Sequence, residues 1–217
     1  MIDPTAAPYG SWPSPISAAI LAQADVAMSD LRVHRGNVYW RESRPQERGR
    51  QVLMQLRDGE ISELTPPGFN VRTRVHEYGG GAWTATPDGV LLFVERSDQR
   101  VYALSAGQEP RPLTPAGTGD RYGGLSWQDG TLLAVRETHD GRPVPTRAIV
   151  AIPTDGSGPT EIVADSDFVA HPALSPSGRH IAWIAWNHPN MPWDASEVRV
   201  GRLEDGVVAE WATIAGG

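Results

Sequence analysis

Short apolar runs separated by tight polar turns recur along most of the chain. In four places a glycine turn leads into a strand-sized apolar run, which is followed by a second run, another glycine turn and a third run. The second-turn glycines are Gly59, Gly107, Gly156 and Gly206, so the repeat spacing is 48, 49 and 50 residues. A repeat of this length built only from strand-sized pieces is typical of β-propeller blades. The sequence therefore predicts an all-β fold: a partial β-propeller of about four blades with four antiparallel strands each.

The pattern places an incomplete propeller at residues 31–217, with blades near 31–65, 80–114, 123–163 and 170–212. The second strands of the blades are nearly continuous apolar runs, such as Gly89–Val94 and Gly178–Ile184. Runs of this kind are typical of strands buried on both faces, as stacked blades require. Because four blades are too few to close the expected ring, we expect two open blade faces and self-association through them.

Residues 1–30 lack this pattern and are expected to form an N-terminal arm with one short helix. The arm is rich in proline, which favours extended chain: Pro4 precedes the stretch from Thr5 to Pro15, which carries Pro8, Pro13 and Pro15. Ser17 is a suitable N-cap residue for a helix that ends before Asp25. The apolar positions at helical spacing are Ile16, Ile20, Leu21 and Ala24.

The connections between the predicted strands fall into two classes. Asp-Gly and Ser-Gly turns join some strands tightly, whereas the connections at 42–49, 66–80, 137–145 and 187–196 are long. Connections in an antiparallel blade alternate between its two ends, so the long ones share one face of the propeller, here called the loop-rich face. Binding residues concentrate on long loops held by a rigid scaffold, so this face is the expected functional face.

Composition and charge limit the classes of partner and the chemistry that the chain could have. Acidic residues outnumber basic residues by 26 to 19, a net charge of −7, and no dense basic run occurs, so nucleic acid is not an expected partner. The absence of cysteine excludes disulfides, thiolate metal ligands and a cysteine nucleophile. The apolar run Ile181–Trp186 is too short to cross a membrane, and the first basic residue is Arg32, so no signal peptide is predicted. We expect a cytoplasmic protein without a membrane partner.

The loop from Arg72 to Gly81 concentrates the chemistry that the sequence offers for substrate binding. Arg74, His76, Glu77 and Tyr78 precede three consecutive glycines that lead into a predicted inner strand. A carboxylate aimed at the central channel could hold a cationic amino terminus, and an arginine could hold a carboxylate. The alternative is a solvated loop in which the glutamate pairs with a neighbouring arginine and the glycines only permit close packing. The sequence leaves both open.

A second loop, Asn187–Asp194, carries two prolines and presents Trp193 and Asp194. Tryptophan dominates many protein interfaces, so these two residues are candidate interface residues. The alternative is a lid that packs on itself, and the sequence does not separate the two.

No catalytic, metal or cofactor site is predicted. Ser126 lies in a sequence that imitates a nucleophile elbow, but the final glycine is missing and a turn follows instead of a helix, so we assign this serine a structural role. His139 follows in the next long loop, yet nothing in the sequence places it near Ser126. The six histidines lack the spacing of metal ligands, and no phosphate-binding helix follows the glycines at 79–81.

Three separated segments resemble the N-terminal part of bacterial S9-family serine peptidases, the prolyl oligopeptidase group that includes dipeptidyl and acylaminoacyl peptidases. These segments are Tyr9–Ile16, His76–Ala82, and His171–Gly178 continued by Asn190–Asp194. The similarity covers essentially the whole chain. The Ser-Pro-Ser-Gly turn at 175–178 also resembles the Ser-Pro-Asp-Gly turn of TolB-type propeller repeats, which is a less specific signal.

The resemblance implies a seven- or eight-bladed propeller followed by an α/β-hydrolase domain that carries the catalytic serine, aspartate and histidine. This sequence holds about four blades and none of that domain, so we expect it to gate the access of short peptides to the missing domain and to be inactive alone. Glu77 is then a plausible contact for the substrate amine. A stand-alone TolB-like or WD40-like propeller that binds proteins is the alternative. A small-molecule hydrolase with its site in the channel ranks last, because inward acidic and histidine ligands are lacking.

Overall fold

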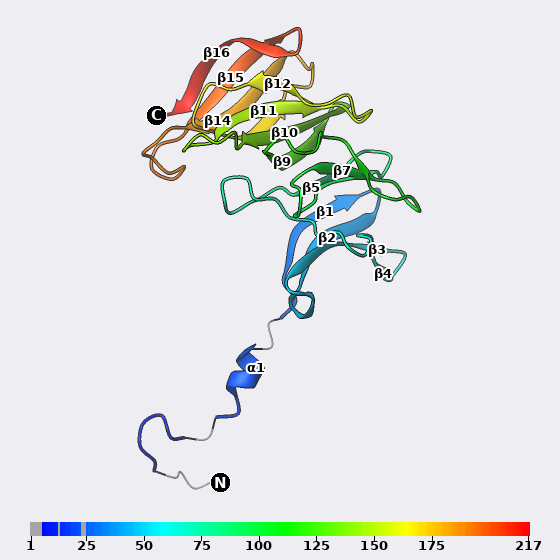
Figure 1. The fold of residues 1–217 in the computed structure, drawn as a ribbon, viewed down its shortest axis with the longest axis vertical. Helices are drawn as coiled ribbons and strands as arrows, with labels where there is room; N and C mark the ends of the chain where they lie inside the picture. Colours follow the sequence, from blue (N-terminus) through cyan, green and yellow to red (C-terminus); the bar gives the residue numbers. More distant parts are fainter. Residues whose placement is uncertain (1–5, 13, 23–24) are drawn as a thin grey trace.

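The computed structural model describes residues 6–12, 14–22 and 25–217 (Figure 1). The regular secondary structure of this part is almost all β: sixteen strands form four antiparallel sheets of four strands, and in each sheet the strands lie in chain order. The prediction of an all-β partial propeller with four four-stranded blades is confirmed. No helix in the described ranges has the length and apolarity that crossing a bilayer requires.

Each sheet is one continuous stretch of the chain. The first contains β1 (Met28–His34), β2 (Asn37–Arg44), β3 (Arg50–Arg57) and β4 (Glu60–Glu63). The second contains β5 (Trp83–Ala85), β6 (Leu91–Val94), β7 (Val101–Leu104) and β8 (Arg111–Pro112). The third contains β9 (Asp120–Gln128), β10 (Thr131–Thr138), β11 (Thr146–Ile152) and β12 (Thr160–Val163). The fourth contains β13 (Phe168–Leu174), β14 (His180–Trp186), β15 (Glu197–Glu204) and β16 (Val207–Gly216).

The N-terminal arm carries the short helix α1 (Ala18–Ala22) and extends away from the sheets (Figure 1). The side-chain oxygen of Ser17 accepts a hydrogen bond from the backbone N–H of Ile20 at 3.1 Å, the contact expected of an N-cap residue. A further 3₁₀ turn, Pro45–Glu47, lies between β2 and β3. Of the positions used to predict the arm and helix, Pro4, Thr5, Pro13 and Ala24 lie outside the described residues.

The apolar runs of the second strands are explained by packing on two sides. In β10, Leu132 and Ala134 belong to the core shared with the second sheet, whereas Leu133 and Val135 belong to the core shared with the fourth. Strand β6 divides its side chains in the same way between the first and third sheets. Burying one such aliphatic side chain stabilises the fold by about 1.5–3 kcal/mol, so each sheet derives much of its stability from its neighbours.

Each blade has a left-handed residue in or just before its innermost strand. The backbone φ angle is 54° at Asp30, 58° at Gly81, 60° at Gly124 and 51° at His171. In β1, β9 and β13 this residue lies where the register with the second strand shifts. A bulge at this point turns the strand and redirects the chain that precedes it. The bend is therefore a repeated element of the blade.

The second and third sheets approach each other most closely at Gly81 and Gly124. The backbone N–H groups of Gly124 and Leu125 donate to the carbonyl oxygens of Gly80 and Gly81 at 3.0 and 2.8 Å. A Cβ atom on Gly81 would lie 2.6 Å from the Cα atom of Gly124. Only glycine leaves room for this backbone contact.

A single side chain joins the third and fourth sheets at the equivalent place. The Gln128 Nε2 atom donates to the carbonyl oxygen of Pro172 at 2.9 Å, and its Oε1 atom accepts from the N–H of Leu174 at 2.6 Å. The same Nε2 atom donates to the Ser126 hydroxyl oxygen at 2.6 Å. Gln128 thus satisfies backbone groups of β13 that no strand of the third sheet reaches.

The first and fourth sheets lie at opposite ends of the stack (Figure 1). Strand pairing puts Met28, Val33 and Ile61 on the side of the first sheet that faces away from the second. These three side chains are 69%, 70% and 65% exposed. The outer face of the first sheet therefore exposes apolar side chains at its margins, whereas Trp40, Val52 and Met54 at its centre are buried.

Replacing Gly81 by alanine tests the close contact between the second and third sheets. We expect Gly81→Ala to lower the free energy of unfolding by about 1–3 kcal/mol more than a glycine-to-alanine change at an open turn, because the added methyl group forces the sheets apart. Gly107→Ala is the matched control, since Gly107 also has a positive φ of 71° but no atom within 4 Å of a Cβ. Urea unfolding followed by tryptophan fluorescence measures both. Equal losses would show that only the backbone conformation matters at Gly81.

Candidate functional site

A segment that we call the strap, residues 70–81, crosses the loop-rich ends of the second and third sheets (Figure 1). Its side chains alternate: Val71, Thr73 and Val75 are 0%, 3% and 4% exposed, whereas Arg72 and Arg74 are exposed. The Thr73 hydroxyl also donates a hydrogen bond to the carbonyl oxygen of Tyr122 in β9. The strap is thus packed as firmly as a strand.

Two buried glutamates hold the strap at its two halves. A carboxylate oxygen of Glu95 accepts from the N–H of Asn70 at 2.6 Å, and one of Glu137 accepts from the N–H of His76 at 3.2 Å. Glu95 is 6% and Glu137 is 1% exposed. Buried carboxylates therefore satisfy backbone donors of the strap that no strand pairs.

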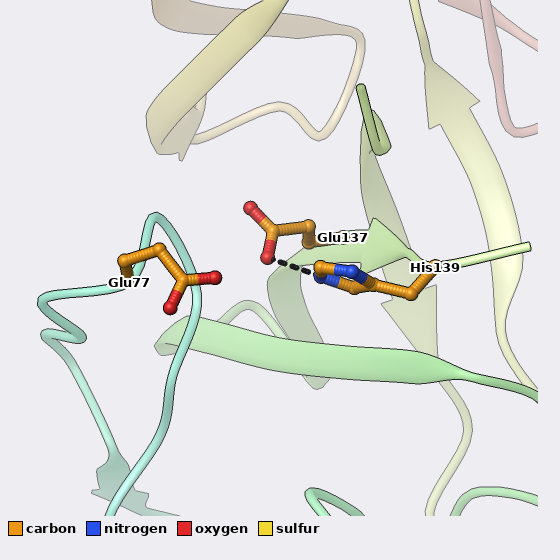
Figure 2. A group of neighbouring side chains, drawn as sticks. All are labelled: Glu77, Glu137 and His139. Atoms are coloured by element: carbon orange, nitrogen blue, oxygen red, sulfur yellow. Dashed lines mark hydrogen bonds and ion pairs between the residues drawn. The ribbon is translucent and has the colours of Figure 1, made fainter. Parts of the chain in front are cut away.

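Glu137 is the centre of a charged network that reaches the surface. Its Oε2 atom lies 2.8 Å from Nε and from Nη2 of Arg147, and its Oε1 atom accepts from His139 Nε2 at 2.7 Å. Arg121 Nη1 lies 3.5 Å from Glu137 Oε1 and 2.8 Å from Glu77 Oε1. Figure 2 shows Glu77, on the strap, beside the bonded pair of Glu137 and His139. The exposed carboxylate of Glu77 is thus connected to a buried one through Arg121.

The network keeps Glu137 ionised. Burial alone would raise the pKa of its carboxyl group, but the hydrogen bond from His139, the positive charge of Arg147 and the N–H of His76 together lower that pKa below its ordinary value. A carboxylate with this many donors is stable inside the protein only while all of them are present.

Glu77, Glu137 and His139 bring their donor atoms within 4.8 Å of one another, a separation that a metal ion could bridge. The charges around them do not fit a metal. Arg121 and Arg147 already pair with the two carboxylates, and a divalent cation would have to displace at least one guanidinium group. The arrangement is an ion-pair network.

His76 is held as a neutral aromatic group. Its ring centroid lies 5.6 Å from that of Trp186, 5.7 Å from Phe168 and 5.9 Å from Tyr78. Burial, together with the nearby charge of Arg147, lowers the pKa of His76 to about 4. The imidazole is therefore uncharged near pH 7, and it packs as part of an aromatic cluster.

A cavity of about 550 Å³ opens between the inner strands next to this cluster. Residues from three different sheets and from the strap line this cavity. Among them are Tyr78, Ser126, His171, Trp186 and Pro192. The walls combine aromatic rings with a few hydroxyl and imidazole groups. A cavity of this volume and lining suits a ligand of dipeptide size.

The structure brings together three of the four predicted substrate-binding residues. His76 and Tyr78 line the cavity, and Glu77 lies beside it in the ion-pair network. Arg74 does not line the cavity; its side chain is exposed, and its N–H donates to Gln99 Oε1 at 2.7 Å. The side chain of Glu77 is 78% exposed and pairs with Arg121. An ion pair of this glutamate with an arginine is what the alternative of a solvated loop predicted.

The second predicted loop presents its tryptophan to solvent. Trp193 is 75% exposed, so it does not pack as a lid on its own loop. A carboxylate oxygen of Asp194 accepts from the N–H of Met191 at 3.1 Å and stabilises the turn. Both residues remain predictions as interface residues.

Glu137 and its two arginines were not predicted from the sequence, although a signal was present. Glu42, Glu95 and Glu137 follow the apolar run of the second strand in the first three sheets, and they are 6%, 6% and 1% exposed. An acid repeated at the end of an apolar run indicates a buried carboxylate with a fixed partner. The sequence around their partners, Arg121 and Arg147, shows no comparable pattern.

Replacing Glu137 by glutamine tests the network. We expect Glu137→Gln to lower the free energy of unfolding by about 3–5 kcal/mol, because Arg147 is left buried without a counter-charge. Glu161→Gln is the matched control: it breaks the pair of Arg136 with a half-exposed glutamate, and such surface pairs contribute only about 0–1 kcal/mol. Equilibrium denaturation measures the difference. Similar values for the two variants would contradict a central role of Glu137.

Known structures resemble this chain closely. A puromycin-hydrolysing peptidase of Mycobacterium tuberculosis is 43% identical with a TM-score of 0.86, over 97% of this chain and 34% of its own. A puromycin hydrolase, solved also as a serine-to-alanine mutant in complex with PGG, is 37% identical with a TM-score of 0.86, over 97% of this chain and 36% of its own. TolB from Acinetobacter baumannii is 15% identical with a TM-score of 0.50 over 82% of this chain and 41% of its own, which shows a likeness of fold alone.

The chain matches no protein-family model and no curated protein. It spans about a third of the length of the puromycin-hydrolysing peptidases. The matches cover nearly all of this chain and the N-terminal portion of those enzymes. In sequence and fold, this chain corresponds to the N-terminal β-propeller portion of S9-family serine peptidases.

Proposed function

We propose that this chain is the propeller portion of an S9-type peptidase and gates the access of short peptide-like substrates to a C-terminal α/β-hydrolase domain. The observation that carries the proposal is the identity of 37–43% to puromycin-hydrolysing enzymes over 97% of the chain. Puromycin contains an amino acid with a free amine, joined through an amide. A substrate of that class has the size of the cavity beside the strap.

The geometry of Glu77 supports an amine-binding role. Its Oε1 atom pairs with Arg121, and within the described residues its Oε2 atom has no hydrogen-bond partner. The side chain is 78% exposed and extends from a strap whose backbone is fixed. A substrate ammonium group would therefore meet a carboxylate that is already in position.

The role proposed for the chain itself is to control substrate access, and it does not supply the catalytic nucleophile. In the described residues no serine side chain hydrogen bonds to a histidine side chain, and the hydroxyl of Ser126 accepts from Gln128. His139, which follows β10, bonds to Glu137. A nucleophile activated by a general base would come from the hydrolase domain.

Grafting the chain onto a catalytic domain tests this function. We expect no hydrolysis of puromycin by the 217 residues alone, and hydrolysis when they replace the matching N-terminal portion of a puromycin-hydrolysing peptidase. In that chimera, Glu77→Gln should raise KM about tenfold for puromycin, through loss of one charge-assisted contact, and leave KM for an N-acetylated analogue unchanged. Glu109→Gln, at an exposed position between β7 and β8, is the control.

Two results would contradict the proposal. The first is turnover by the isolated chain that a serine-directed inhibitor abolishes. The second is a folded chimera in which Glu77→Gln affects the free amine and the acetylated substrate equally.

A propeller portion and a stand-alone interaction module differ in their behaviour in solution. We expect the isolated chain to self-associate through the outer face of the first sheet, where Val33 is 70% exposed. Light scattering at increasing concentration should show that Val33→Glu reduces association, whereas Val144→Glu, at a site 49% exposed in a distant loop, leaves it unchanged. A monomeric parent chain that melts cooperatively would favour the stand-alone module.

A further inference from the structure

A compact basic patch lies on the loop-rich face of a chain whose net charge is −7. Arg72 and Arg74 of the strap and Arg96 of the β6–β7 connection form this patch, here called the arginine patch, and all three are exposed. Among the described residues none of the three has a carboxylate within ion-pair distance. Other arginines of the same face, such as Arg121 and Arg147, are paired.

One buried side chain fixes the backbone of the whole patch. Gln99 is 6% exposed, and its Oε1 atom accepts from the N–H of Arg74 at 2.7 Å. Its Nε2 atom donates to the carbonyl oxygens of Arg96 at 2.9 Å and of Arg72 at 3.3 Å. The three arginines therefore project from a common rigid base, which reduces the entropy lost when they bind.

The acids next to the patch are already engaged. The Glu95 carboxylate accepts from the N–H groups of Asn70 and Ser97 at 2.6 and 3.0 Å. The Asp98 carboxylate accepts from the N–H of Arg100 and from the hydroxyl of Tyr102 at 3.0 and 2.7 Å. Both carboxylates thus have donors other than the three arginines, whose guanidinium groups stay free to pair with an external anion.

We propose that the arginine patch is a docking surface for an acidic segment of a polypeptide, whose carboxylates pair with the three guanidinium groups. Planar guanidinium groups recognise carboxylates through paired hydrogen bonds. Three arginines match a short acidic segment, whereas nucleic acid requires a longer basic track that a chain of net charge −7 does not offer. This inference goes beyond the proposed gating function and does not depend on it.

Two exposed aromatic side chains lie on the same face of the propeller. Tyr78 and Trp193, carried by long connections of the same face, are 67% and 75% exposed. Arginine, tyrosine and tryptophan are the residue types that dominate binding energy at protein interfaces. The patch supplies the charge, and the aromatic groups supply apolar contact area.

Binding of a labelled deca-glutamate peptide to the 217-residue chain tests the proposal, with fluorescence anisotropy as the readout. The patch variant Arg72→Gln/Arg74→Gln/Arg96→Gln should bind about tenfold more weakly than the parent chain. The control Arg35→Gln/Arg57→Gln/Arg179→Gln removes the same charge from the tight-turn face and should bind within about twofold of the parent. Rising salt should weaken binding by the parent chain.

Three outcomes would overturn the proposal. The parent chain could bind deca-glutamate no better than deca-glutamine. Both triple variants could lose affinity equally, which would indicate a response to net charge alone. A ten-nucleotide single-stranded DNA could bind more tightly than the peptide, which would assign the patch to nucleic acid. The altered side chains are exposed, and circular dichroism checks that both variants fold. Since the measurement involves no hydrolysis, its failure leaves the gating proposal intact.

Discussion

The buried carboxylate of Glu137 is the interaction on which the functional face depends. It joins three parts of the chain: the strap through the N–H of His76, β11 through Arg147, and the loop after β10 through His139. Removing a carboxylate from water is unfavourable by several kcal/mol, and only a full set of donors offsets this. The same requirement that stabilises Glu137 therefore fixes the strap, and with it the position of Glu77 beside the cavity.

The stacking of the sheets imposes a second constraint, because a single blade has no core of its own. Strands such as β10 bury one set of side chains against the preceding sheet and the alternate set against the next. Stability is thus shared between neighbours, as in other repeat architectures. The cavity follows from this arrangement, since strands from different sheets converge on it without filling it.

The sequence was sufficient to predict features that depend on local chemistry. The turns Asp58-Gly59, Asp129-Gly130 and Asp205-Gly206 have positive φ at both residues, the geometry that Asp-Gly favours between paired strands. Inner strands were harder to predict: the third blade begins with β9 at Asp120 rather than near residue 123, because the left-handed bulge interrupts the alternating pattern. The contact between His76 and Glu137 spans 61 residues, and no local pattern encodes it. The exposed position of Arg74 likewise depends on tertiary packing.

The close backbone contact at Gly81 and Gly124 has a mechanical consequence. It holds the second and third sheets together through their backbones, so these two sheets cannot separate at this point. At the neighbouring seams the innermost strands are linked through side chains, by Gln128 on one side and by Arg32 and His34 on the other. Relative movement of neighbouring sheets is therefore easier at these two outer contacts, so the first and fourth sheets can shift while the middle two stay together.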